Sequence, residues 1–190
     1  MEKKGIILIV DDRIDEKIGT FQDHLYKNGF SVKIAENLEE ACRDLDNYLK
    51  DNILDGIILD FSFPVDSKDQ SVNTKGIPNG VVLLDKYKFK IGVKRIPVVI
   101  NTTGDEDYKK KYLASLGNLE MPIYNVNHQA SPLARPSMRM IKDIVNMFNQ
   151  RCEYRKTTGQ IQQDKSWLNK GTTGTYDKKT GKYHYNRDGD

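Results

Sequence analysis

The chain has little of several features that define whole classes of protein. Its 190 residues contain two cysteines, Cys42 and Cys152, which are too few for a disulfide framework. No apolar run approaches the length of a membrane span. The apolar run from Ile6 to Val10 ends at acidic residues and is too short for the core of an export signal. We therefore expect a soluble, cytoplasmic protein that has no membrane partner.

Charge and catalytic patterns exclude further classes. Thirty Lys and Arg against 27 Asp and Glu give a net charge of +3, which is too small to indicate a nucleic-acid partner by itself. The histidines His24, His128 and His184 lack the spacing of zinc ligands. We find neither a Gly-rich phosphate loop nor a Ser/His or Cys/His pair. An independent enzyme is the least supported class.

What the chain does have is an alternation of short apolar strands with helical patterns. Continuous β-branched runs are typical of strands buried on both faces of a parallel sheet. Strands are predicted at 6–10, 30–34, 56–60, 96–101 and 121–126. Helices are predicted at 14–25, 38–49, 81–90, 108–116 and 137–150. This order predicts an α/β fold, with a doubly wound five-stranded parallel sheet and helices on both faces.

Polar residues directly follow three of these strands. They are Asp11 and Asp12 after the first strand, Asp60 after the third, and Thr102 and Thr103 after the fourth. Ligands of such folds bind outside the carboxyl ends of the strands. Carboxylates gathered there need a cation, oxygen ligands suit Mg²⁺, and a carboxylate beside a metal can attack a phosphoryl group. Alternatively, Asp11 and Asp12 cap the first helix, and the two threonines cap the fourth.

Three motifs occur in a fixed order: Ile7-Leu8-Ile9-Val10-Asp11-Asp12, Ile57-Ile58-Leu59-Asp60-x-x-x-Pro64, and Pro97-Val98-Val99-Ile100-Asn101-Thr102. Together they resemble the receiver domain of two-component response regulators. The likeness covers about residues 4 to 150. It implies a flavodoxin-like sheet with strand order 2-1-3-4-5.

The resemblance also implies a role for each residue that follows a strand. Asp60 would be the phosphoacceptor. Asp11 and Asp12 would position Mg²⁺, and the backbone carbonyl of Ser62 would complete the protein ligands. Thr102 would be the switch hydroxyl, with Thr103 as the second choice.

Partners follow from the same resemblance. A sensor histidine kinase or a phosphotransfer protein would donate the phosphoryl group, and an output protein would bind the fourth and fifth helices. The only chemistry expected of the chain itself is its phosphorylation from a donor and its dephosphorylation. We therefore expect a stand-alone receiver in a phosphorelay.

Two departures from the receiver pattern stand out. Residues 65–76 form an insertion that separates Pro64 from Pro78-Asn79-Gly80, whereas the family keeps its proline and glycine close together. The family also has a lysine at the end of the fifth strand, but no lysine lies between Lys111 and Lys142.

The position of that lysine falls in a region that holds Tyr124, Asn125 and Asn127. Lys68 or Lys75 of the insertion is a candidate substitute for the missing cation. If nothing replaces it, the chain is a receiver that takes no phosphate and acts as an interaction module.

Residues 151–190 differ in character from residues 1–150 and are predicted to be a separate extension. They hold nine Lys or Arg against five Asp or Glu, together with Trp167 and four tyrosines. Residues 175–185 are predicted to form a hairpin that turns near Thr180-Gly181. The extension either packs as a simple tail or uses its basic and aromatic residues to bind nucleic acid, which makes an adaptor the third hypothesis.

Overall fold

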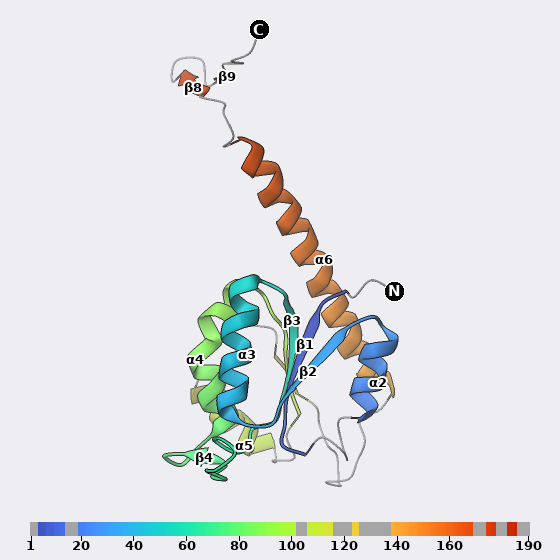
Figure 1. Ribbon diagram of the computed structural model, residues 1–190, viewed down its shortest axis with the longest axis vertical. Helices are drawn as coiled ribbons and strands as arrows, with labels where there is room; N and C mark the ends of the chain where they lie inside the picture. Colours follow the sequence, from blue (N-terminus) through green and yellow to red (C-terminus); the bar gives the residue numbers. More distant parts are fainter. Residues whose placement is uncertain are drawn as a thin grey trace. The chain divides into compact units, whose positions relative to one another are not determined.

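The computed structural model describes residues 4–13, 19–101, 106–115, 123–125, 138–168, 174–177 and 182–185. A five-stranded parallel sheet has the order β2-β1-β3-β6-β7, which confirms the predicted doubly wound 2-1-3-4-5 arrangement (Figure 1). Its strands are β1 (Ile6–Val10), β2 (Ser31–Ala35), β3 (Leu54–Leu59), β6 (Val98–Ile100) and β7 (Ile123–Asn125). The central strand β3 is buried along its whole length, including Asp55, and the apolar run from Ile57 to Leu59 is typical of such a strand.

Helices cover both faces of this sheet. They are α2 (Gly19–Lys27), α3 (Leu38–Asp51), α4 (Asn79–Val93), α5 (Glu106–Ser115) and α6 (Met138–Leu168). One apolar core joins the sheet to α3 and α4, and the other joins it to α2 and α6 (Figure 1). The alternation of inward residues along the strands produces these two cores, because successive side chains point to opposite faces.

A close approach fixes α6 on its face of the sheet. A Cβ atom at Gly56 of β3 would lie 2.2 Å from the ring of Phe148. Phe148 itself is fully buried and meets Phe30 edge to face. Glycine at this position therefore lets the helix pack its largest core side chain directly against the central strand.

Helix α6 ends later than predicted. The sequence pattern placed its end at residue 150, whereas the helix continues to Leu168. Arg151 and Cys152 are still buried, so the core-facing stripe of the helix extends past that point. No glycine or proline interrupts the helix before Gly159. The more basic composition that begins at residue 151 does not by itself end a helix.

The chain divides into two compact units, Met1–Cys152 and Glu153–Asp190. In the second unit, β8 (Gly174–Asp177) pairs antiparallel with β9 (Lys182–Tyr185), and the turn expected near Thr180-Gly181 lies outside the described residues. None of the helices in the described part of the chain combines the length and apolar character that crossing a membrane requires.

Candidate functional site

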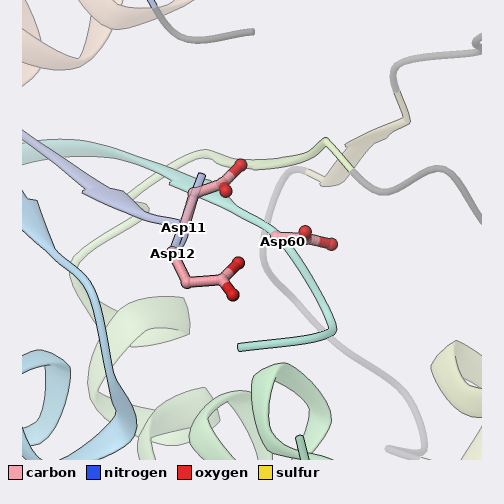
Figure 2. Close-up of side chains that lie close together, drawn as sticks. All are labelled: Asp11, Asp12 and Asp60. Atoms are coloured by element: carbon pink, nitrogen blue, oxygen red, sulfur yellow. The ribbon is translucent and has the colours of Figure 1, made fainter. Parts of the chain in front are cut away.

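Three carboxylates meet where the central strands end. Asp11 follows β1 and Asp60 follows β3, and these strands are paired so that Val10 lies opposite Leu59. One carboxylate oxygen from each of Asp11, Asp12 and Asp60 lies within 4.8 Å of the others. Figure 2 shows the three side chains directed to the same side of the strand ends. The predicted gathering of these residues is therefore present.

The sheet itself fixes where these residues stand. The Asp60 N–H donates to the Val10 carbonyl over 2.9 Å, and the Asp11 N–H donates to the Ala35 carbonyl over 3.1 Å. Hydrogen bonding between strands thus continues one residue beyond the end of each strand. The backbone of Asp11 and of Asp60 is therefore positioned by hydrogen bonds of the sheet.

Backbone N–H groups also orient the carboxylates. The N–H of Arg13 donates to Asp11 Oδ1 over 2.8 Å, and the N–H of Phe61 donates to Asp60 Oδ1 over 2.6 Å. Asp11 and Asp60 are 2% and 5% exposed, whereas Asp12 is exposed and lies 3.7 Å from the Arg13 guanidinium. Two buried carboxylates this close repel each other, and a bound cation relieves the repulsion.

The donor set suits Mg²⁺. This ion prefers oxygen ligands, takes few protein carboxylates and keeps several waters, so one exposed and two buried carboxylates match its needs. Asp11, Asp12 and Asp60 are the residues that would hold it. The N–H of Ser62 lies 3.4 Å from Asp60 Oδ1, and the role of the Ser62 carbonyl as a further ligand stays a prediction.

The insertion is ordered by its own backbone and anchored to α3. The carbonyls of Pro64 and Val65 accept hydrogen bonds from the N–H groups of Leu38 and Glu39, which the first turn of a helix leaves without an intrahelical partner. Asn37 caps the same helix, because its side chain accepts from the Glu40 N–H over 2.9 Å. The insertion therefore begins as part of the capping of α3.

Further along, the insertion contains a small hairpin that the sequence did not predict. Strand β4 (Asn73–Thr74) pairs antiparallel with β5 (Ile77–Pro78). Lys75 and Gly76 connect them with φ angles of 54° and 78°. Two consecutive residues with positive φ are characteristic of the tight turns that match the twist of a hairpin.

Asn79 ties this hairpin back to the strand end. Its side chain is fully buried and donates to the carbonyls of Phe63 and Ser71 over 2.7 and 3.0 Å. Its Oδ1 accepts from the Thr74 hydroxyl over 2.9 Å. Sequence reasoning missed this role, because an Asn after a Pro at a helix start is an ordinary turn pattern.

Gly80 brings the start of α4 against the backbone of Asp60 and Phe61 at the end of β3. A Cβ atom there would lie 2.4 Å from the Asp60 carbonyl oxygen and 2.8 Å from the Phe61 Cα. The Gly80 N–H donates to the Phe61 carbonyl over 3.0 Å. The insertion that separates Pro64 from this glycine in sequence thus leaves the glycine in contact with the end of β3.

Hydrogen bonds stabilise the ionised form of two carboxylates in the insertion. The N–H groups of Asp69 and Lys68 donate to Asp66 and lower its pKa below the usual 3.8. Ser71, through its hydroxyl and then its backbone N–H, lowers the pKa of Asp69 in the same way. The tip of the insertion is therefore organised around two charged Asp side chains.

Other predicted residues lie outside what the structure describes. Thr102, Thr103 and Asn127 fall outside the described residues, as does the segment in which Asp11 and Asp12 would cap a helix. Tyr124 and Asn125 lie on β7. Lys68 and Lys75 lie in the insertion, and the substitute for the missing lysine stays a prediction.

Solved structures share this arrangement of strands and helices. A response regulator receiver domain protein from Clostridium thermocellum is 21% identical with a TM-score of 0.51, and the match covers 81% of this chain and 98% of that one. The phosphorylated cyanobacterial phytochrome response regulator RcpA is 22% identical with a TM-score of 0.52, and the match covers 76% and 93%. The chain has the receiver fold.

A two-component response regulator from Clostridium difficile also shares the receiver fold, at 21% identity and a TM-score of 0.51, over 77% of this chain and 97% of that one. No protein-family model and no curated protein matches the sequence. At these identities the likeness establishes the fold alone.

Proposed function

We propose that the chain is a phosphorelay receiver that accepts a phosphoryl group on Asp60 with Mg²⁺ bound by Asp11, Asp12 and Asp60. The observation that supports this most directly is the placement of three carboxylates within 4.8 Å of one another at the strand ends of a receiver fold. A sensor histidine kinase or a phosphotransfer protein would be the donor. The output protein would bind the surface formed by α5 and α6.

In the proposed reaction, a carboxylate oxygen of Asp60 attacks the phosphorus of the donor. The bond from phosphorus to the leaving group breaks, and an aspartyl phosphate forms. The hydrogen bond from the Phe61 N–H holds the Asp60 carboxylate in one orientation during the attack. When bound, Mg²⁺ supplies positive charge that offsets the charge of the phosphoryl group.

Intact-mass spectrometry tests the proposal with acetyl phosphate as donor. We expect the wild-type chain to gain the mass of one phosphoryl group when Mg²⁺ is present, and no gain when it is omitted. Asp60→Asn should gain nothing. Asp85→Asn is the matched control, because it removes an exposed carboxylate of α4 that pairs with Lys88, and it should gain the same mass as the wild type.

A second candidate function rests on the missing lysine. With no lysine between Lys111 and Lys142, the phosphoryl group loses a charge-assisted hydrogen bond that receivers ordinarily provide. The chain would then be an interaction module that takes no phosphate. The absence of an adduct, under conditions that modify a known receiver, would favour this candidate over the first.

A further inference from the structure

A groove separates two helices on the face of the sheet that is covered by α2 and α6. Its volume is about 340 Å³, and Figure 1 shows the two helices side by side. Six residues line it: His24, Lys27, Asn28, Lys142, Val145 and Asn146. This size falls within the range of sites that bind small molecules.

The lining carries positive charge and hydrogen-bond donors without a carboxylate. Lys27 and Lys142 each bring one positive charge to the lining, and Asn28 and Asn146 bring amides, of which the Asn28 amide already donates one hydrogen bond to the His24 carbonyl over 2.8 Å. Among the described residues, neither lysine has an ion pair or hydrogen-bond partner, and the lining contains no Asp or Glu. Two like charges facing one groove favour an anion between them.

Helix dipoles explain only part of this charge. His24 and Lys27 lie in the last turn of α2, where cations are stabilised by the carbonyl end of the helix. Lys142 lies near the start of α6, where the dipole favours anions. The stability of α6 therefore does not explain why a lysine occupies this position in the groove.

A buried nitrogen atom of His24 also indicates a ligand in the groove. His24 Nδ1 is buried and has no hydrogen-bond partner, while Nε2 lies 3.3 Å from the sulfur of Met138. A buried polar atom without a partner is costly, and a ligand that hydrogen-bonds to it recovers that cost. The apolar side chain of Val145 offers a contact for the uncharged part of such a ligand.

We propose that this groove binds the phosphate group of a small organic molecule. Lys27 and Lys142 hold the phosphate between them, the Asn146 amide and the second N–H of the Asn28 amide donate hydrogen bonds, and Val145 contacts the organic part. Ammonium groups recognise phosphate as compact point charges, so two of them on facing helices form a binding site without a Gly-rich loop. The site is separate from Asp60 and does not depend on the proposed phosphorylation.

Chemical-shift mapping of the full, isotopically labelled chain tests the proposal with phenyl phosphate and inorganic phosphate as probes. The titrations are run without Mg²⁺ and at constant ionic strength. We expect saturable shifts at the amides of Asn28 and Asn146 and at the His24 ring. Phenyl phosphate should bind several-fold more tightly than inorganic phosphate.

Variants separate specific binding from general electrostatic attraction. Replacing both groove lysines, as Lys27→Gln with Lys142→Gln, should weaken binding at least about tenfold, which is about 1.4 kcal/mol. The control pair, Lys50→Gln with Lys110→Gln, removes the same charge from exposed positions on α3 and α5 and should leave binding unchanged.

Two results would overturn the proposal: no saturable shifts in the groove, or equal weakening in both double variants. Asp60→Asn separates this site from the carboxylates. Because Asp60 is not in the groove, this variant should bind phenyl phosphate like the wild type even if it accepts no phosphoryl group.

Discussion

The carboxylates at the strand ends and the groove between α2 and α6 both gather like charges, but they do so in opposite ways. At the strand ends, the charges are on short Asp side chains, and hydrogen bonds of the sheet hold the backbone of Asp11 and Asp60. These two residues are almost fully buried. In the groove, the charges sit at the ends of long side chains on helix surfaces. The strand ends therefore fix the distances between carboxylate oxygens, whereas the groove provides a local excess of positive charge without fixed distances.

This difference predicts different sensitivities. A metal ion needs ligands at defined distances, so binding at the strand ends should respond to the removal of a single oxygen or to a small backbone shift. Binding in the groove should respond to the number of charges and to salt, because exposed ammonium groups adapt to their ligand and are screened by salt.

The largest effect is expected from Gly80→Ala. The new methyl group would lie 2.4 Å from the Asp60 carbonyl oxygen, and neither backbone segment can move away cheaply. We expect a loss of about 3 kcal/mol in the free energy of unfolding and slower phosphorylation of Asp60. Denaturant unfolding and intact-mass measurements check both. Unchanged phosphorylation in this variant would show that the close contact does not position Asp60.

A smaller loss is expected from Asn79→Ala. The substitution leaves the carbonyls of Phe63 and Ser71 without their buried donor. We expect a loss of about 2 kcal/mol in the free energy of unfolding, because buried polar groups without partners are costly. Thr74→Val is a matched comparison, since it removes only the hydroxyl that donates to Asn79, and it should cost less than Asn79→Ala. Equal costs would contradict this account of how the insertion is anchored.

Removal of one strand-end carboxylate is expected to raise the free energy of unfolding, whereas the two substitutions above lower it. Asp11→Asn removes one of two buried charges that repel each other, and an amide oxygen can still accept from the Arg13 N–H. Without metal, we expect this variant to be more stable than the wild type by on the order of 1 kcal/mol. Mg²⁺ should raise the unfolding temperature of the wild type more than that of the variant. A variant that is less stable without metal would argue against repulsion in the ion-free site.

The smallest effect concerns pH and stays within the insertion. The pKa values of Asp66 and Asp69 are lowered in the folded chain, so their stabilisation is present above the unfolded value near 3.8 and is lost as pH falls through the lower folded values. Protection from amide exchange at Lys68, Asp69 and Ser71, measured relative to the intrinsic rate at each pH, should therefore fall below about pH 4. The same change should be absent at the Asn28 and Asn146 amides of the groove, which serve as the internal control.

Much of the fold follows from local sequence patterns. The buried runs at Ile6–Val10 and Ile57–Leu59 predicted central strands, and the alternation with helices predicted a doubly wound parallel sheet. The strand order that the structure has was implied by the resemblance to receiver domains. Asp11, Asp12 and Asp60 were predicted to come together because each directly follows a strand. These predictions succeed because burial and strand ends leave a signal within a few residues of sequence.

The sequence did not predict features that depend on segments far apart in the chain. The burial of the Asn79 side chain belongs to this group, and so does the presence of Lys27 and Lys142 in the lining of one groove. Each residue involved has an ordinary local pattern, and its partners are set by packing rather than by spacing. The end of α6 at Leu168 and the hairpin of β4 and β5 are local features that the sequence patterns also missed.

The sequence by itself thus determined the order of strands and helices and the acidic residues at the strand ends, because hydrophobic periodicity and side-chain chemistry are local properties. The tertiary structure decided which distant groups share a site: it brought Gly80 against the end of β3 and placed α2 beside α6. The physical reason is that close packing and hydrogen bonding between segments depend on the complete fold, and a single stretch of sequence does not contain them.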